Sequence, residues 1–186
     1  MLIGIAGVTG VGKSYYKNKL VDELNFEKVK IITNREIRYG EVNSEDKIFL
    51  NKIEIQELRD SGKLAYEFEF LGNTYAYTKE EIFSNKNMVF EMHYSCIQDF
   101  KRICPNLKVI YLLPKDIEIC ISKLKDRNLK SEVEKARILE IKEHYNKITT
   151  DEKLKNMFDY IVYNNYDKET DEKILNIVKM IKEVKQ

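Results

Sequence analysis

Glycine is missing from most of this sequence. None of the seven glycines lies beyond Gly72, whereas four of the seven fall within the first twelve residues. Glycine tolerates positive φ and close backbone approach, but it costs conformational entropy on folding. A chain that avoids glycine elsewhere and clusters it at one place is expected to need tight backbone curvature there.

Other absences exclude whole classes of protein. No apolar run approaches the roughly 20 residues that a membrane-spanning helix needs. The 32 basic and 31 acidic residues nearly cancel, which gives no support for general binding to nucleic acid or to a membrane surface. There is also no repeat, low-complexity tract or Pro/Gly/Ser linker. With 186 residues, 43% of them hydrophobic, one domain or one domain with insertions is expected.

The cysteines give no sign of an oxidised protein. Cys96, Cys104 and Cys120 are odd in number, widely spaced and without CxxC spacing. Met1 is followed by only a short apolar run, so no secretory leader is expected. We predict a reduced, cytoplasmic protein whose partners are small molecules, and both a monomer and a homodimer remain open.

The clustered glycines lie in a phosphate-binding pattern. The segment GVTGVGKS fits GxxxxGK[ST], with an apolar strand-like run before it and helical spacing of Tyr16, Leu20 and Leu24 after it. A loop between a strand and a helix N-terminus offers backbone N–H groups and a positive dipole end to phosphate. Lys13 would reach the β and γ phosphates of ATP, and the Ser14 hydroxyl would bind Mg²⁺. The predicted ATP-binding residues of the loop are Gly7, Val8, Thr9, Gly10, Val11, Gly12, Lys13 and Ser14.

The rest of the chain alternates between strands and helices. Apolar runs predict five strands, over Leu2 to Ala6, Glu27 to Thr33, Met88 to Met92, Leu107 to Leu113 and Tyr160 to Tyr163. Apolar stripes at helical spacing separate the later ones. Strands buried on both faces and separated by helices indicate an α/β fold with a five-stranded parallel sheet and right-handed crossovers.

Two stretches break this rhythm. Residues 34–82 hold the three remaining glycines and many aromatics, and the alternation in YEFEFLGNTYAYT suggests a small antiparallel piece of sheet. We interpret this stretch as an inserted acceptor lobe. Residues 127–137 are polar and charged and lie between two predicted helices. Such a run is commonly a solvated loop, but beside a phosphate loop we expect a mobile lid that carries arginines.

Several motifs, in collinear order, resemble the guanylate kinases. GVTGVGKS is similar to the family's GPSGVGKS, residues 60–78 look like its segment ending in GNxYGT, and residues 109–127 look like its strand, proline and RLxxR helix. FDYIVYNN, residues 158–165, is similar to FDYVIVND. The family's TTRxxRxGE is matched by Thr33, Arg35, Arg38, Gly40 and Glu41.

The resemblance implies a P-loop NTPase core at residues 1–33 and 82–186, an α+β acceptor-binding lobe at 34–81 and a small lid at 126–138. It also implies phosphoryl transfer from ATP, with Mg²⁺, to a nucleoside monophosphate, and GMP or dGMP is the expected acceptor. A different nucleotide or phosphorylated acceptor stays open. So does a non-catalytic guanylate-kinase-like module that binds peptides, although such modules typically lose the lysine that is present here as Lys13.

Site residues follow from the same resemblance. Arg127 and Arg137 would close over the triphosphate, with Arg127 also against adenine, and Glu91 would lie near the metal with Ser14. The acceptor side would comprise Arg35, Arg38, Glu41, Tyr66, Tyr75, Tyr77, Glu91 and His93. Guanidinium groups bind phosphate bidentately, which suits the arginines to the acceptor phosphate. A monophosphate is already anionic at neutral pH, so transfer needs no general base. The catalytic residues would be Lys13, Arg35, Arg38, Arg127 and Arg137, acting by positioning and charge neutralisation.

Departures from the family concern the recognition of the base. Where the family has a serine, a tyrosine and two guanine-reading carboxylates, this chain has Ile31, Lys47, Tyr66 and His93. A carboxylate facing the N1 and N2 donors of guanine is the expected way to select that base, and neither a tyrosine nor a histidine supplies one. Glu67 and Glu69 alternate to the opposite face from Tyr66. Lys123 also replaces an arginine, which keeps the charge but loses a bidentate contact. The identity of the base is therefore left open.

Overall fold

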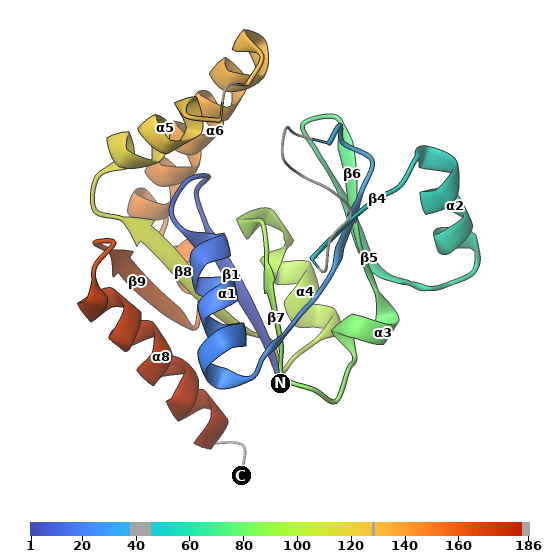
Figure 1. Cartoon of the computed structure of the whole chain (residues 1–186), viewed down its shortest axis with the longest axis horizontal. Helices are drawn as coiled ribbons and strands as arrows, with labels where there is room; N and C mark the ends of the chain where they lie inside the picture. Colours follow the sequence, from blue (N-terminus) through green and yellow to red (C-terminus); the bar gives the residue numbers. More distant parts are fainter. Residues whose placement is uncertain (38–45, 128, 184–186) are drawn as a thin grey trace.

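The computed structural model describes residues 1–37, 46–127 and 129–183, and they form two sheets with surrounding helices (Figure 1). The first sheet is parallel throughout, in the order β2-β7-β1-β8-β9. Its strands are β1 (Leu2–Gly7), β2 (Glu27–Lys28), β7 (Met88–Glu91), β8 (Lys108–Pro114) and β9 (Tyr160–Asn164). The predicted α/β fold with a five-stranded parallel sheet flanked by helices is confirmed.

The second sheet has the order β4-β3-β6-β5. Its strands are β3 (Ile31–Thr33), β4 (Lys47–Phe49), β5 (Leu64–Phe70) and β6 (Asn73–Thr78). β5 and β6 form the antiparallel hairpin that the aromatic alternation predicted. The sheet is nevertheless mixed, because β4 runs parallel to β3. The predicted antiparallel piece is confirmed, and the parallel pairing of β3 with β4 is a further feature that the pattern of neither strand encodes.

The helices are arranged around the first sheet and beside the second (Figure 1). They are α1 (Lys13–Leu24), α2 (Lys52–Asp60), α3 (Lys79–Ile82), α4 (Ile97–Ile103), α5 (Ile117–Lys125), α6 (Ser131–Thr150), α7 (Glu152–Lys155) and α8 (Lys168–Glu183), with a short 3₁₀ helix η1 (Tyr94–Cys96) before α4. None of the helices in the described part of the chain is both long and apolar enough to span a bilayer.

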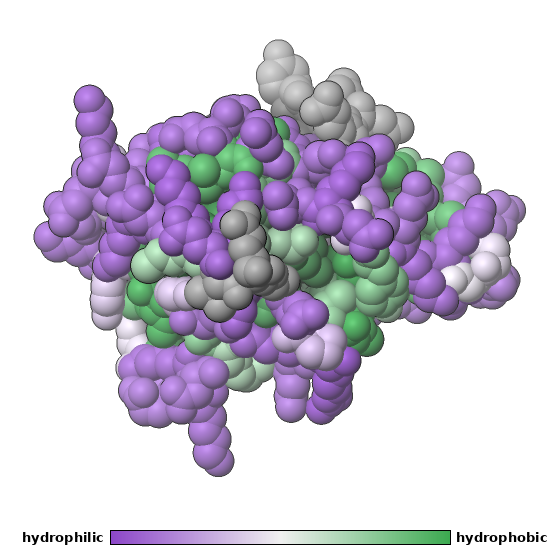
Figure 2. Space-filling view, turned by 90° about the horizontal axis from the view of Figure 1, so that it is seen from below, coloured by the Kyte–Doolittle hydropathy of each residue, from purple (hydrophilic) through white to green (hydrophobic). Residues whose placement is uncertain are grey.

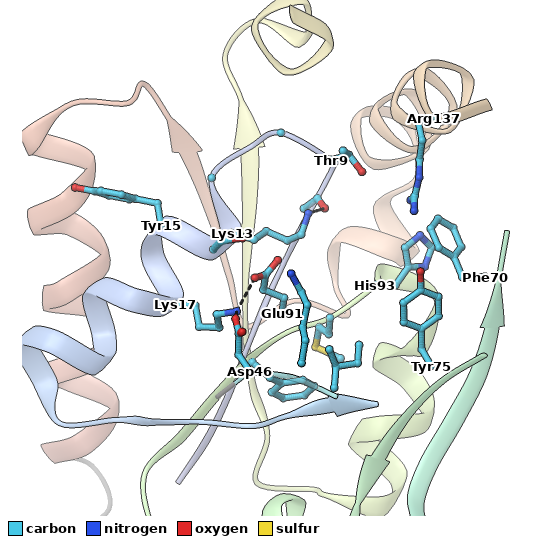
Figure 3. Close-up of a pocket in the computed structure, with 18 of the residues that line it drawn as sticks. Thr9, Lys13, Tyr15, Lys17, Asp46, Phe70, Tyr75, Glu91, His93 and Arg137 are labelled. Atoms are coloured by element: carbon cyan, nitrogen blue, oxygen red, sulfur yellow. Dashed lines mark hydrogen bonds and ion pairs between the residues drawn. The ribbon is translucent and has the colours of Figure 1, made fainter. Parts of the chain in front are cut away.

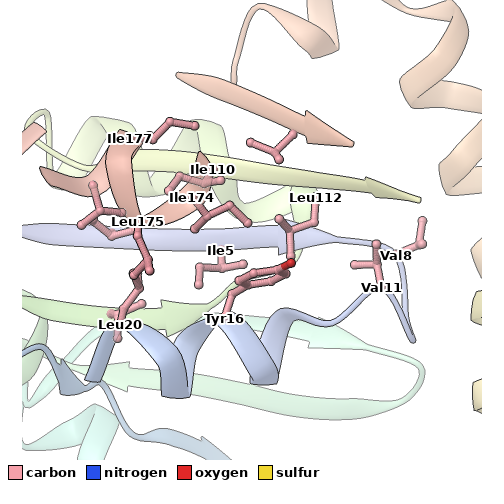
Figure 4. Packing of buried hydrophobic residues seen from close by; sticks show 14 of the residues in the cluster. Ile5, Val8, Val11, Tyr16, Leu20, Ile110, Leu112, Ile174, Leu175 and Ile177 are labelled. Carbon is pink, nitrogen blue, oxygen red and sulfur yellow. The ribbon is translucent and has the colours of Figure 1, made fainter. Parts of the chain in front are cut away.

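Hydrophobic side chains cover both faces of the parallel sheet. On one face, Ile5 and Ile110 pack with Tyr16 and Leu20 of α1 and with Ile174 of α8 (Figure 4). On the other face, the alternate side chains of the same strands, such as Val109 and Tyr111, pack against η1, α4 and the end of α6. The helical residues in this contact include Ile97, Phe100 and Ile148. Burial on both faces explains why β8 reads as a continuous apolar run. Hydrophilic side chains cover much of the face drawn in Figure 2, with hydrophobic residues between them.

Two predicted element boundaries were wrong. The run Glu27 to Thr33 is not one strand: β2 pairs with β7 in the first sheet, and β3 pairs with β4 and β6 in the second. An apolar run records burial but not a change of partner. The stretch 127–137 is also not all loop, because α6 begins at Ser131 and carries Arg137 on its second turn. Glu132 and Glu134 lie in the first turn of α6, where their negative charges stabilise the helix by interacting with the positive end of its dipole.

Asp159 joins the two last strands of the parallel sheet. Its carboxylate accepts a hydrogen bond of 2.9 Å from the Val109 N–H and lies 3.0 Å from Lys101 Nζ and 3.2 Å from Lys108 Nζ. Burial alone would raise the pKa of Asp159, but the Val109 N–H and the two lysines hold it below its ordinary value. Hydrogen bonds to a charged group typically contribute about 1.5–3 kcal/mol.

We therefore expect Asp159→Ala to lower the free energy of unfolding at pH 7 by about 1.5–3 kcal/mol, measured by urea denaturation. The folded-state pKa is depressed, so the contribution of Asp159 is present above its ordinary pKa of 3.8 and is lost as the pH falls below that value. Asp159→Asn keeps an acceptor for Val109 but not the charge. If the free energy of unfolding fell with acid pH in the same way for wild type and for Asp159→Asn, this account would be contradicted.

Candidate active site

The loop after β1 has the curvature that its glycines predicted. Gly10 has φ 85° and Gly12 has φ 98°, both in the left-handed region that favours glycine. A Cβ at Gly10 would lie 2.7 Å from the carbonyl oxygen of Cys120, and one at Gly12 would lie 3.1 Å from Asn164 Nδ2. The loop therefore passes too close to its neighbours for any side chain at Gly10, and α1 begins directly after the loop.

Asn164, at the end of β9, anchors this loop from beneath. Its Nδ2 donates to the Val11 carbonyl at 2.8 Å, and its Oδ1 accepts from the Tyr16 hydroxyl at 3.0 Å and from the Tyr166 N–H at 2.8 Å. Asn164 is buried, so these bonds are shielded from water. The shape of the loop is therefore maintained by a strand more than 150 residues away in the sequence.

Lys13 lies at the centre of the loop. Its ammonium group donates to the carbonyl oxygens of Gly7 and Val8, both at 2.9 Å. Burial lowers the pKa of Lys13, and Arg127 lowers it further, against the opposing effect of Glu91 and Glu140. An ammonium has three N–H donors, and two are used by the loop. One donor therefore remains for an anion above the loop.

A cleft of about 850 Å³ lies above the loop and brings together residues from distant segments. The predicted site residues that line it are Gly7, Thr9, Gly10, Gly12, Lys13, Ser14, Arg35, Tyr75, Tyr77, Glu91, His93, Arg127 and Arg137. Val8 and Val11 lie instead in the hydrophobic core beneath the loop. Arg38 and Glu41 fall outside the residues that the structure describes. Figure 3 shows Lys13 and Glu91 on one side of this cleft and His93, Tyr75 and Arg137 on the other.

The wall opposite Lys13 is aromatic with cationic groups above it. Phe70 contacts two neighbours, with the Arg137 guanidinium 4.8 Å from its ring centroid and the His93 ring centroid at 4.5 Å in a tilted arrangement. Tyr75 lies beside Phe68, with ring centroids 5.3 Å apart. Such a wall suits a flat ring bearing an anionic group, because rings stack on aromatics and guanidinium binds phosphate.

Comparison with known proteins agrees with this geometry. The family model described as guanylate kinase matches residues 1–183. The chain belongs to the guanylate kinase family. Among curated relatives, a guanylate kinase of Prochlorococcus marinus is 32% identical over 97% of this chain and 96% of its own length. A guanylate kinase of Lactococcus lactis is 28% identical over 96% of this chain and 86% of its own.

A solved structure of similar shape supports the fold alone. The crystal structure of guanylate kinase from Anaplasma phagocytophilum superimposes with a TM-score of 0.72 at 19% identity, over 97% of this chain and 85% of that chain. The arrangement of the parallel sheet and its helices is thus that of a guanylate kinase.

Sequence reasoning missed an ion-pair cluster in this guanylate kinase family member. Lys17 Nζ lies 2.5 Å from Asp46 Oδ2 and 2.8 Å from Glu91 Oε1, and Figure 3 shows it between the two carboxylates. Burial would raise the pKa of Glu91, but Lys17 and Lys13 hold it below its ordinary value. The signal was present, because Lys17 shares the buried helical stripe of Leu20, three residues on.

Tyr66, expected at a guanine-reading position of the family, does not line the cleft. Its hydroxyl donates to Asp99 at 3.0 Å, and its ring packs 4.7 Å from that of Phe100, away from Lys13. Glu67 and Glu69 take the opposite side of β5, as alternation predicted: Glu67 pairs with Arg59 at 2.8 Å, and Glu69 accepts from Thr74. None of the three presents a carboxylate to the cleft.

His93, at the other expected guanine-reading position, lies beside two residues that sequence reasoning did not connect to it. Glu140 and His144 lie on α6, and Glu140 Oε1 is 3.7 Å from both His93 Nε2 and His144 Nδ1. Burial lowers the pKa of His144 to about 4. Burial would raise the pKa of Glu140, but the two imidazoles lower it to about 2. Only their spacing of four on one helix hinted at the pairing of Glu140 with His144.

Proposed function

We propose that this protein transfers the γ-phosphoryl group of ATP to a nucleoside monophosphate, with GMP or dGMP as the acceptor. The observation that carries the proposal is that one cleft is lined by the Lys13 phosphate loop and by Arg35 and Tyr75, with Tyr75 on the side opposite Lys13 (Figure 3). The names of the curated relatives support GMP as the acceptor. Two phosphate-binding walls across one cleft are what a transfer between two nucleotides requires.

The donor side would bind the triphosphate of ATP. Backbone N–H groups at the start of α1 and the remaining Lys13 donor would bind the β and γ phosphates. The Ser14 side chain is close enough to the Glu91 carboxylate to help lower its pKa, so two oxygen ligands of the kind that Mg²⁺ prefers lie near each other. When bound, Mg²⁺ supplies charge neutralisation to the phosphates. Arg127, beside Lys13, would neutralise further charge.

The acceptor side would bind and orient the monophosphate. Arg35 reaches the cleft from the segment after β3, with its guanidinium 5.0 Å from the ring centroid of Phe49 and Nη1 donating to the Glu36 carbonyl at 2.8 Å. Tyr75 would donate its hydroxyl to the same phosphate, and Arg38 and Glu41 are proposed to belong to this side. The acceptor oxygen is already anionic, so the protein has to position it in line rather than deprotonate it.

A screen of nucleoside monophosphates with ATP and Mg²⁺ tests the proposal. A coupled spectrophotometric assay would follow ADP formation with GMP, dGMP, AMP, UMP and CMP in turn. Highest kcat/KM with GMP or dGMP supports the proposal. ATP binding without turnover on any acceptor would instead indicate a non-catalytic binding module.

A second candidate is the same reaction with a different nucleotide acceptor. It is favoured by one observation: Tyr66 is turned toward Asp99, and His93 replaces the other expected carboxylate, so neither position offers a carboxylate to the N1 and N2 donors of guanine. Preference for another base in the same screen would establish this candidate.

Arg35→Ala is expected to raise the KM for the monophosphate by about 10- to 100-fold, because a charge-assisted contact of about 1.5–3 kcal/mol is lost. The KM for ATP should change much less, since Arg35 comes from the segment after β3 and not from the phosphate loop. Arg35→Lys, which keeps the charge but not the fork, should lie between the two. Steady-state kinetics with each substrate varied separately measures this. Equal effects on both KM values would contradict the assignment.

A further inference from the structure

We propose that His93, Glu140 and His144 form a binding site for a divalent transition metal ion of the zinc class. This site is separate from the magnesium site expected at Ser14. It does not depend on the proposed function, because metal binding can be measured without any turnover.

The side chains of His93, Glu140 and His144 point toward one another, as the ligands of a metal ion do. One ligand atom from each, His93 Nε2, a Glu140 oxygen and His144 Nδ1, lies within 4.8 Å of the other two. The Glu140 Oε1 atom is 3.7 Å from each imidazole nitrogen. In a tetrahedral zinc site, bonds of about 2.0–2.2 Å place neighbouring ligand atoms about 3.4 Å apart. Small side-chain movements would therefore bring all three to bonding distance.

The two converging nitrogens are also unsatisfied. Within the described part of the chain, His93 Nε2 and His144 Nδ1 are buried side-chain atoms without a hydrogen-bond partner. Buried polar atoms are rarely left so, since each costs the free energy of its lost hydration. Both nitrogens face the same carboxylate, at a separation too long for a hydrogen bond. A cation between the three groups satisfies all of them.

The opposite nitrogen of each imidazole is already engaged. His93 Nδ1 is 2.7 Å from Ser95 Oγ, and His144 Nε2 is 3.0 Å from the Tyr111 hydroxyl. The Tyr94 ring stacks on His144 with centroids 3.7 Å apart. Partners of this kind fix the orientation of a metal-binding imidazole and leave its other nitrogen for the ion. Two imidazoles and one carboxylate form a donor set that favours Zn²⁺ and similar ions over Mg²⁺.

The site can be reached from outside. His93, Glu140 and His144 line a cavity of about 350 Å³ next to the cleft, and His93 and Glu140 line the cleft as well. The Thr9 hydroxyl of the phosphate loop donates to Glu140 Oε2 at 3.5 Å. A metal ion held by three protein ligands here would adjoin the phosphate-binding loop, with a fourth position for water or a nucleotide oxygen.

Titration calorimetry of the metal-free full-length chain with Zn²⁺ is the first test. One equivalent of Zn²⁺ should bind. Glu140→Gln, which keeps the size of the side chain but loses the anionic ligand, should weaken binding by more than about 100-fold, beyond what loss of an orienting partner costs. Glu132→Gln, an exposed position in the first turn of the same helix, is the matched control and should bind like the wild type. No binding, or equal affinity in Glu140→Gln and wild type, overturns the proposal.

Tyr111→Phe tests the positioning of His144. The variant keeps the buried ring and removes the hydroxyl, so Zn²⁺ affinity should fall by about 10- to 100-fold while the far-ultraviolet circular dichroism stays unchanged. Wild-type affinity in Tyr111→Phe overturns this part of the proposal.

Nuclear magnetic resonance identifies the ligands directly, because the chain has only two histidines. Long-range ¹H–¹⁵N spectra should show Zn²⁺ shifting His93 Nε2 and His144 Nδ1, with the ring protons carried by the other two nitrogens in the metal-bound form. Cobalt(II) absorption provides a control for the three cysteines, since binding to thiolate produces an intense charge-transfer band. That band, or imidazole nitrogens unmoved by Zn²⁺, overturns the proposal.

Discussion

Lys13→Ala is expected to lower kcat for phosphoryl transfer by about 10²–10³-fold, the usual cost of losing one charge-stabilising donor in a water-poor site. Lys13 is held by two carbonyls of its own loop, so its remaining donor is already aimed above the loop before ATP binds. Preorganisation of this kind is what makes the contact worth more than an equivalent bond in water. Steady-state kinetics with saturating acceptor and ATP measures the loss.

Controls separate the loss of chemistry from a loss of fold. Lys173→Ala removes an exposed lysine from α8 and should leave kcat unchanged. The urea midpoint of Lys13→Ala should be compared with that of wild type, because the Gly7 and Val8 carbonyls lose a partner. A folded Lys13→Ala variant with wild-type kcat would show that the phosphate loop does not carry the reaction.

Lys17→Met is expected to lower the free energy of unfolding at pH 7 by about 3 kcal/mol. Removing one member of a buried ion pair typically costs about 3–5 kcal/mol, because the remaining charge is left uncompensated. The lower end applies here: the side chain of Lys17 is 5% exposed, but those of Asp46 and Glu91 are 22% and 28% exposed. Methionine retains most of the aliphatic volume, so little of the loss should come from packing.

Adding Glu91→Gln to Lys17→Met should restore part of the lost stability, since one of the two unpaired carboxylates is neutralised. The difference in the free energy of unfolding between wild type and Lys17→Met should also shrink as the pH falls below 4.5, the ordinary pKa of Glu91. The pKa of Glu91 is lowered in the folded wild type, so its stabilising charge is lost only in that range. Urea denaturation from pH 7 to well below pH 4.5 measures both effects.

Lys19→Met is the matched control for Lys17→Met. Lys19 is on the same helix and also has two carboxylate partners, Glu23 at 2.7 Å and Asp171 at 3.1 Å, but it lies nearer the surface. Surface ion pairs contribute about 0–1 kcal/mol, so the loss should be small. Equal losses at Lys17 and Lys19 would show that burial of the cluster is not what matters.

Sequence patterns predicted this protein best where the physical requirement is local. The phosphate loop could be found because positive φ at Gly10 and Gly12 restricts the residue type at those positions. Strands β1, β7 and β8 of the parallel sheet could be found because burial on both faces demands continuous apolar runs. The run over Glu27 to Thr33 was misassigned because a sequence pattern does not record that β2 and β3 pair in different sheets.

Contacts between distant segments were the part that no local pattern encodes. Lys17 of α1 meets Asp46, which precedes β4, and Glu91 of β7, and the partner of a buried charge depends on which segments become neighbours. Tyr66 could not be placed from its motif, because Phe100 and Asp99 on α4 draw it away from the cleft.

The sequence by itself determined the nucleotide-binding loop, the class of fold and the family, because each depends on short-range backbone geometry or on the periodicity of burial. The tertiary structure alone decided that Lys17 joins two carboxylates and that His93 meets Glu140 and His144 across 47 residues or more of chain. The reason is that proximity of side chains is set by how helices and strands pack, and the free energy of that packing is spread over the whole core.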